Sequence, residues 1–412
     1  MDFPQDFRCP ISMELMEEPV TISTGVSYER KNIEKWLFTY MKTTCPATMQ
    51  RIENYDVTPN HTLKRLILSW QQNGYASSSP PPSPAQQPST KHDELVSLIG
   101  TVGSTPFKVS SLKKLKAIIE MGSETKRDFK KSGGVEALVK IAVQVLDENS
   151  DFEAFRDCEE ALLVLHHLEL SEEDESLIQS CFSRPEPMKA LAVMVQRGSA
   201  EARFYAISMF QKLAMAKFDW NVVIQDKGMD FFKSMLELVS DGICTKVSST
   251  ALQVLIEIFN SSKKSRLKAI EAGAMCVLIE ILPDSNRSKC EKVMELIKLL
   301  CECAEGRLAF LEHGLAIGAI SKKLLHASNC ATKIGVKILW AICKYHPTER
   351  VLEEFVAFGA VKKLVALLHI NGPSSTKDKA VMILKMHGSS WMRYPCFPTE
   401  LGEYLGLVND FS

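Results

Sequence analysis

Two cysteine-proline pairs near the start of the chain are the residues whose type and spacing first suggest chemistry. Cys9 begins CPI and Cys45 begins CPA, at positions where a zinc finger with two metal ions would place ligands. Such a pair of ions needs about eight Cys or His ligands, because each structural zinc takes about four. Residues 1–75 supply only Cys9, Cys45 and His61. The number of ligands therefore excludes a zinc site, and we expect neither a metal nor another cofactor.

The same two thiols are poor candidates for nucleophilic catalysis. A catalytic cysteine needs a neighbouring base, and no helical spacing places His61, the one histidine of residues 1–75, beside either thiol. The loops around the thiols must then be held by hydrogen bonds and ion pairs. Polar side chains are dense there, although each could equally face water: Ser23, Thr24, Tyr28, Glu29, Arg30, Thr48, Gln50, Arg51 and Asn60.

Short elements must position these loops. VTIS at 20–23, followed by Thr24-Gly25 and VSY, predicts a hairpin. A helix should follow it, and a second helix should begin after a cap at Asn60. Each helix has one apolar stripe with i, i+3, i+4, i+7 spacing: Ile33, Trp36, Leu37 and Tyr40 in the first, and Leu63, Leu66, Ile67 and Trp70 in the second.

The composition of the whole chain limits its class. Its 412 residues suggest two or three domains or one repeat structure, and 49 basic against 50 acidic residues leave no field to hold nucleic acid or an anionic membrane. No apolar run suits a signal peptide or a membrane span. We therefore expect a cytoplasmic protein. KKSRLK at 263–268 would allow nuclear import, but it suits the solvated start of a helix better.

A linker and a repeat organise the remainder. Residues 76–90, ASSSPPPSPAQQPST, contain five prolines and no large apolar residue, so the predicted domains are 1–75, a linker at 76–93, and 94–412. Glycines 228, 273, 314 and 359 each precede an apolar helical segment, at steps of 45, 41 and 45 residues. This period, with a turn glycine in each unit, predicts a mostly helical armadillo solenoid of about six to seven repeats that ends in a C-terminal cap.

The longer helix of each repeat should line a concave groove that binds a protein partner. Aligning these helices by their apolar positions makes six residues equivalent: His167, Lys212, Glu257, Lys298, Ala341 and Lys385. None is the asparagine that holds peptide backbone in importin-like carriers, which argues against a transport receptor. The lysines suggest a mildly basic groove and an acidic partner segment, although exposed lysines are usually only solvated.

Three segments in fixed order resemble a known domain. They are FRCPISMELMEEPVTISTGVSYERKNIEKWL, TTCPATMQ and TPNHTLKRLILSW, and across residues 4–72 they resemble the U-box, a zinc-free relative of the RING finger. With the linker and the armadillo repeats, the chain is similar to the plant U-box armadillo ubiquitin ligases. The resemblance implies a ligase that binds a ubiquitin-charged conjugating enzyme, forms no covalent ubiquitin intermediate, and recruits its substrate through the repeats. It also implies either a monomer or a U-box homodimer, and a role in plant stress or defence.

Carried over by position, the resemblance implies a contact surface for the conjugating enzyme made of Ile11, Met13, Trp36 and Pro46. The family pattern implies that the side chain of Ile11 faces outward, although a β-branched residue in such a loop more usually belongs to the core. It also overrides the helical spacing of Trp36, which by itself favours the core.

One position departs from the family pattern. Many RING-type ligases place a basic residue in the second loop to hold the charged enzyme, but Met49 stands there and has no donor. Gln50 or Arg51 could substitute for it. The departure leaves open a rival hypothesis, in which the U-box only docks partners and the protein is a non-catalytic scaffold.

Overall fold

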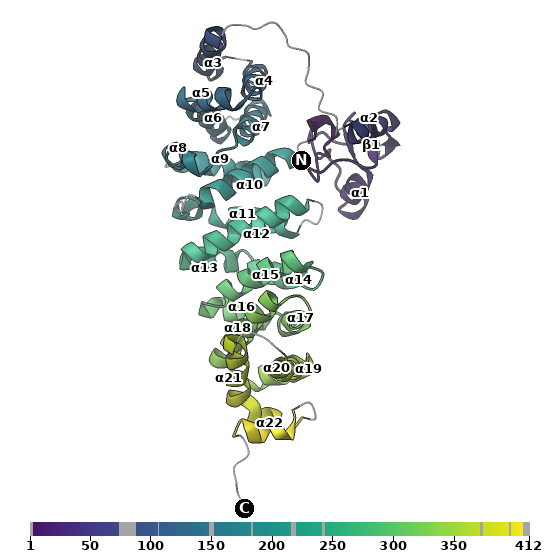
Figure 1. Cartoon of the computed structure of the whole chain (residues 1–412), viewed down its shortest axis with the longest axis vertical. Helices are drawn as coiled ribbons and strands as arrows, with labels where there is room; N and C mark the ends of the chain where they lie inside the picture. Colours follow the sequence, from purple (N-terminus) through teal and green to yellow (C-terminus); the bar gives the residue numbers. More distant parts are fainter. Residues whose placement is uncertain are drawn as a thin grey trace, which may run out of the picture. The chain divides into compact units, whose positions relative to one another are not determined.

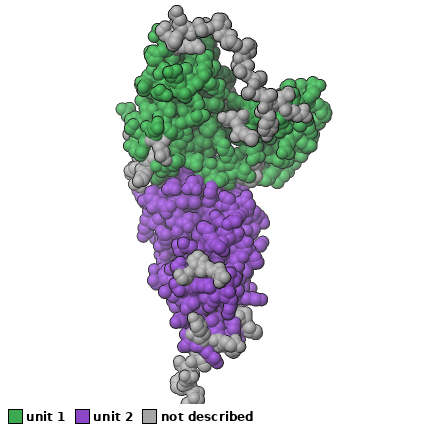
Figure 2. Space-filling model, viewed as in Figure 1, with its two compact units in different colours: residues 1–226, 241–251 green, residues 227–240, 252–412 purple. Residues whose placement is uncertain are grey.

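The computed structural model describes residues 3–73, 88–105, 107–147, 152–182, 184–215, 220–240, 244–370, 374–394 and 397–406. The chain forms two compact units (Figure 2). The first unit is Met1–Asp226 with Asp241–Ala251, and the second is Lys227–Ser240 with Leu252–Ser412. The predicted linker lies outside the described residues up to residue 87, and its last residues, from Pro88, begin a helix.

A small sheet organises the N-terminal module, residues 3–73, which also contains the short helix η1 (Gln5–Phe7). Strand β1 (Pro19–Thr21) pairs antiparallel with β2 (Ser27–Glu29) and, on its other edge, with β3 (Thr58–Pro59). The predicted hairpin is therefore present, and its turn contains Gly25 at a left-handed φ of 78°. The sequence does not predict β3, because two residues carry no alternation to detect.

Two helical segments complete the module. The first is α1 (Arg30–Glu34), which continues as the π-helical turn η2 (Lys35–Thr39), and the second is α2 (His61–Asn73). Asn60 caps α2 as predicted, because its Oδ1 accepts a hydrogen bond from Leu63 N–H at 2.9 Å. The apolar stripes contribute to one core cluster: Cys9, Ile11, Met16, Val20, Ile22, Tyr28, Ile33, Leu37, Cys45, Ile52 and Ile67.

Helices make up the rest of the first unit (Figure 1). In chain order they are α3 (Pro88–Val102), α4 (Lys108–Ile119), α5 (Ser123–Lys131), α6 (Gly134–Val143), η3 (Gln144–Leu146), α7 (Phe152–His167), η4 (Glu172–Asp174), α8 (Glu175–Phe182), α9 (Pro185–Arg197) and α10 (Ala200–Met215). The longer helices stack in sequence, with α4 against α7 and α7 against α10. Each helix covers an apolar face of the one before it, as in a solenoid.

The second unit repeats this arrangement. Its helices are α13 (Lys263–Glu271), α14 (Ala274–Ile281), α15 (Arg287–Leu300), α16 (Ala304–Glu312), α17 (Ala316–Lys323), α18 (Asn329–Tyr345), α19 (Glu349–Ala357), α20 (Ala360–His369), α21 (Ser374–Trp391) and α22 (Thr399–Tyr404). Here α15, α18 and α21 stack in order. The units divide within α11 (Asn221–Ser240) and α12 (Thr245–Ser261). No helix among the described residues has the length and apolar character needed to span a membrane.

The repeat glycines follow the prediction only in part. Gly273 and Gly359 adopt left-handed φ angles of 88° and 72° directly before α14 and α20, as expected of turn glycines. Gly314 lies between α16 and α17 without a left-handed φ. The prediction that Gly228 is a turn residue is wrong, because Gly228 lies inside α11. A glycine costs a helix only about 1 kcal/mol, which burial of the adjacent Phe231 and Phe232 outweighs.

We expect Gly306→Ala to destabilise the second unit by about 1–3 kcal/mol, because it overpacks a site closed by backbone. A Cβ at Gly306 would lie 1.9 Å from the Leu300 carbonyl oxygen. The matched control is Gly314→Ala, since a Cβ there meets nothing within 4 Å. Urea unfolding of both variants measures the difference, and equal midpoints would contradict this packing.

Candidate functional site

A buried hydrogen-bond network surrounds Cys45. Its Sγ lies 2.9 Å from the Tyr28 hydroxyl oxygen and accepts a hydrogen bond from Thr24 Oγ1 at 3.3 Å. The Tyr28 hydroxyl also accepts from the Ala47 N–H at 3.1 Å. A phenol that accepts there has its one proton left to donate to the thiol sulfur. Tyr28 thus links β2 to the loop that begins at Cys45.

The pKa values of this pair fit that assignment. Burial raises the pKa of Tyr28, and so does its hydrogen bond to Cys45, which keeps the phenol protonated. Burial would likewise raise the pKa of the Cys45 thiol, but hydrogen bonds from Thr24, Thr48 and Tyr28 together leave that pKa lowered. The sulfur of Cys45 is therefore an acceptor at the centre of the network.

Cys9 has a similar role on the other loop. Its Sγ accepts from the Glu29 N–H at 3.3 Å and from Asn32 Nδ2 at 3.7 Å. Glu29 in turn accepts the backbone N–H groups of Glu17 and Glu18 at 2.8 and 2.9 Å. We call the hydrogen-bonded network around Cys9 and Cys45 the thiol brace. It contains Tyr28, Thr24 and Glu29 from the predicted polar set, whereas Ser23 and Arg51 of that set are exposed.

The two loops that the brace supports, residues 9–14 and 45–50, have the same backbone geometry. In each, the cysteine N–H bonds the carbonyl five residues later, at 2.9 Å to Glu14 and 2.8 Å to Gln50. In each loop, the N–H of the methionine four residues after the cysteine donates a hydrogen bond to the cysteine carbonyl. Met13 and Met49 both adopt left-handed φ angles, 60° and 58°.

A short internal repeat in the sequence accompanies the matching geometry of the two loops, and it could have predicted that geometry. CPISM at 9–13 and CPATM at 45–49 share the cysteine, the proline, a hydroxyl residue and the methionine. Met49 is therefore the counterpart of Met13 and occupies a conformation that costs a side chain roughly 1–2 kcal/mol. Considered without this repeat, Met49 stands out only as a residue that has no hydrogen-bond donor.

The expected contact residues lie on or beside these loops. Ile11, expected to face outward, is instead a member of the core cluster and only 5% exposed, because its branched apolar side chain packs beneath the first loop. Met13 in the first loop and Pro46 in the second loop are also buried. Trp36 is half-buried against the core, and its Nε1 donates to the Thr44 carbonyl at 2.7 Å. Trp36 is thus tied to the residue before the second loop, and a contact surface for a conjugating enzyme at these positions stays a prediction.

Comparison with known families decides the assignment. The model for the plant U-box protein ARM repeat region matches residues 94–402, and the U-box domain model matches residues 3–74. The chain belongs to the plant U-box proteins with armadillo repeats. The predicted fold, a U-box followed by an armadillo solenoid, is therefore confirmed.

Curated relatives extend over nearly the full length of this U-box armadillo protein. It is 35% identical to the E3 ubiquitin-protein ligase PUB23 of Arabidopsis thaliana, over 97% of this chain and 96% of the relative. It is 33% identical to the E3 ubiquitin-protein ligase PUB22 of the same plant, over 97% and 98%. A designed armadillo repeat protein of solved structure aligns with 60% of this chain and 99% of its own at 18% identity and a TM-score of 0.44, too weak a likeness to carry a conclusion.

The six groove positions all lie on the long helix of their repeats. They are His167 on α7, Lys212 on α10, Glu257 on α12, Lys298 on α15, Ala341 on α18 and Lys385 on α21. Lys385 is exposed, and the other five are half-buried. Lys298 pairs with Glu295 of its own helix at 2.5 Å, which reduces the positive charge that it offers to a partner.

A half-buried histidine lies next to this row. The ring of His166 packs edge-on to Phe204 and tilted to Tyr205, with centroids 5.2 and 5.0 Å away. Burial, and then the charge of His167, lowers the pKa of His166 to about 4. His166 is therefore neutral at neutral pH and serves the packing of α7 on α10.

A possible group of metal ligands, which the sequence analysis did not find, lies in the second unit. Among the described residues, Cys276, Glu280 and His313 bring one sulfur, one oxygen and one nitrogen donor within 4.8 Å of one another. Sequence spacing hides this group, because His313 follows α16 whereas Cys276 and Glu280 lie on α14. Cys276 and Glu280 are exposed, so the group is open to solvent.

Tyr28→Phe should destabilise the U-box by about 1–3 kcal/mol, because it removes the buried hydroxyl that accepts from the Ala47 N–H and bonds the Cys45 Sγ. Hydrogen exchange of residues 9–52 in the full chain measures the loss. Tyr55→Phe, at an exposed tyrosine, is the matched control. EDTA should leave the exchange unchanged, and chelator-induced unfolding would overturn the metal-free brace.

The first unit should lose stability as the pH falls from about 6.5 to 4. In this range the unfolded chain protonates His166 whereas the folded chain does not, so the stability present above pH 6.5 decreases by up to about 3 kcal/mol. Hydrogen exchange of α7 and α10 against pH measures this loss. His166→Gln should flatten the profile over this range, and an unchanged profile would exclude His166 as the cause.

Proposed function

We propose that this protein is a ubiquitin-protein ligase of the RING type. In this proposal its U-box binds a ubiquitin-charged conjugating enzyme, and its armadillo repeats recruit the substrate whose lysines receive ubiquitin. The observation that carries the proposal is the thiol brace, which holds two matched loops beside Trp36. The relatives named E3 ubiquitin-protein ligases support it over nearly the whole chain.

The chemistry of the site favours a catalyst that works by orientation. Both thiols are fully buried and accept hydrogen bonds, so neither is available to form a thioester with ubiquitin. A rigid pair of loops can instead hold the charged enzyme in a reactive geometry, and such positioning can contribute several kcal/mol. Met13, Trp36 and Pro46 are the residues that we propose contact the enzyme, with Ile11 supporting the first loop from the core.

The second loop must also act on the bound ubiquitin thioester. Met49 is 43% exposed and offers no donor. The adjacent Gln50 and Arg51 are exposed and carry N–H groups. We propose that these two residues supply whatever hydrogen bond the charged enzyme receives from this loop.

The groove row is the proposed substrate surface. Its mixture of His167, Lys212 and Glu257 with the paired Lys298 supports recognition by shape and local charge rather than capture of extended backbone. A role in plant stress or defence is proposed on family membership alone, because the matching relatives are plant proteins. A cytoplasmic site of action is proposed on the amino-acid sequence alone.

A second candidate function, a non-catalytic scaffold, is favoured by one observation. The residues that would contact the conjugating enzyme on the two loops, Met13 and Pro46, are buried in this structure. A U-box that docks its partners elsewhere and activates no conjugating enzyme would not need these two residues to be accessible. Reconstitution with activating enzyme, a panel of conjugating enzymes, ubiquitin and ATP separates the two functions.

Trp36→Ala should lower the rate of ubiquitin discharge from the charged conjugating enzyme to free lysine by tenfold or more, equivalent to about 1.4 kcal/mol or more of lost transition-state stabilisation. Tyr55→Ala, at an exposed aromatic of the same domain, should leave the rate unchanged. Circular dichroism checks that both variants remain folded. Ile11→Ala would be a poorer test, because loss of buried methyl groups would destabilise the core. If the Trp36→Ala variant discharged ubiquitin at the normal rate, the proposed contact surface would be wrong.

A further inference from the structure

Both loops of the U-box contact armadillo helices within the first unit. In the second loop, the Pro46 carbonyl accepts a hydrogen bond from the N–H of Ala200, the first residue of α10, at 3.2 Å. In the first loop, the Ser12 carbonyl accepts from Cys244 Sγ, just before α12, at 3.4 Å. Outside the loops, Lys116 Nζ of α4 donates to Gln5 Oε1 at 2.6 Å. The U-box is thus held at three points.

The contact covers residues that the proposed function needs to be accessible. Met13 is 6% exposed although it is not a member of the cluster that fills the U-box core. Its neighbour Ser12, whose carbonyl meets Cys244, is equally buried. Pro46, whose carbonyl meets α10, is buried as well. The armadillo helices therefore occupy the loop surfaces on which a conjugating enzyme would bind.

The two sides of the contact match in polarity and charge. The first N–H groups of a helix have no partner within the helix, and the Pro46 carbonyl satisfies one of them on α10. Burial raises the pKa of Glu201 on α10, and the nearby positive charge of Arg8 opposes that shift. Arg8 directly precedes the first loop, so the charge of a U-box cation acts on an armadillo carboxylate.

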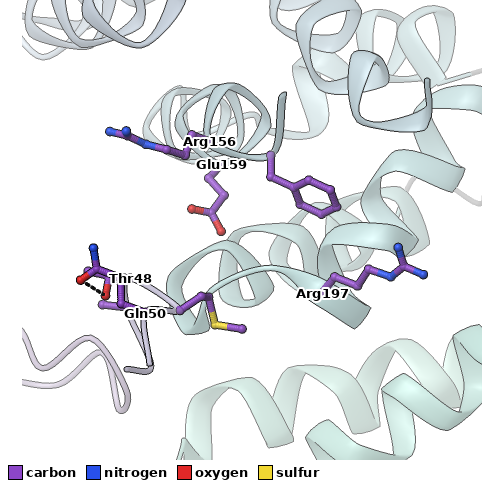
Figure 3. Close-up of a pocket in the computed structure, with 8 residues that line it drawn as sticks. Thr48, Gln50, Arg156, Glu159 and Arg197 are labelled. Carbon is purple, nitrogen blue, oxygen red and sulfur yellow. Dashed lines mark hydrogen bonds between the residues drawn. The ribbon is translucent and has the colours of Figure 1, made fainter. Parts of the chain in front are cut away.

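The contact is nonetheless incompletely packed, as expected of one that can open. A cavity of about 510 Å³ separates the second loop from α7 and α9 (Figure 3). Thr48 and Gln50 line it from the loop, Arg156 and Glu159 from α7, and Arg197 from α9. Polar, partly open contacts between domains separate more readily than a continuous apolar core.

We propose that the surface formed by the starts of α10 and α12 is an intramolecular docking site for the two U-box loops, so that the armadillo repeats and the conjugating enzyme compete for them. The proposal rests on the proposed function, since it concerns the same loops. In the docked state the ligase is autoinhibited. If about 90% of the molecules are docked, release increases the apparent affinity for the conjugating enzyme about tenfold.

Two substitutions on the armadillo side remove the contact while preserving the helices. Ala200→Pro deletes the N–H that bonds Pro46, and proline is well tolerated as the first residue of a helix. Cys244→Asp replaces a donor with an acceptor that repels the Ser12 carbonyl. Ser248 N–H bonds the Cys244 carbonyl at 3.0 Å, so residue 244 caps α12, a position that aspartate favours.

A matched control and a direct probe of docking complete the design. Ala304→Pro makes the same change at the exposed first residue of α16. Ser12→Cys places a second thiol beside Cys244, and a crosslink between residues 12 and 244, located by mass spectrometry, reports docking without any conjugating enzyme. All measurements use the full-length chain.

The Ala200→Pro and Cys244→Asp variants should bind a conjugating enzyme about tenfold more tightly and should discharge ubiquitin correspondingly faster. The Ala304→Pro variant should behave like the unmodified chain. The crosslink should form in Ser12→Cys and decrease when Ala200→Pro is added. Trp36→Ala should cancel the gain.

Other results separate the two proposals. Unchanged affinity in both released variants, or no 12–244 crosslink, would overturn autoinhibition while leaving ligase activity intact. Tighter binding of the conjugating enzyme without any discharge would support the competition and overturn the catalytic function instead.

Discussion

The hydrogen bond between the Tyr28 hydroxyl and the buried Cys45 sulfur is the interaction on which the U-box depends. It joins β2 to the second loop across 17 residues of chain, and the Glu29 N–H bond to Cys9 does the same for the first loop. A metal ion would bring such loops together by strong coordination bonds. Here each bond contributes only about 1 kcal/mol net, so the brace depends on several bonds that form together in a dry interior.

The brace explains why the loops are similar and why their cysteines are not nucleophiles. Each thiol accepts hydrogen bonds at the base of a loop whose methionine takes a strained left-handed conformation. The rigid loops can then present their surface residues at defined positions beside Trp36. This geometry suits a protein that orients another enzyme's thioester, and Met49 is explained as the structural counterpart of Met13 in the second loop.

Hydrogen bonds between polar groups link the U-box to the solenoid. A solenoid exposes the N–H groups at the starts of its helices, and the U-box loops expose carbonyl groups at their tips. The Pro46 carbonyl and the Ala200 N–H satisfy one another, as do the Ser12 carbonyl and Cys244. In the proposed competition, a conjugating enzyme displaces these bonds when it reaches the loops.

Local pattern in the sequence determined much of this protein. The scarcity of ligands in residues 1–75 excluded a zinc finger, period-two and 3.6-residue patterns predicted the hairpin and helices, and the repeat of about 44 residues predicted the solenoid. Only the tertiary structure decided that the Ile11 side chain lies in the core, that a continuous helix runs through Gly228, and that Met13 and Pro46 are buried. These depend on contacts between residues far apart in the chain, such as Ser12 with Cys244, and no periodicity or composition encodes such a contact.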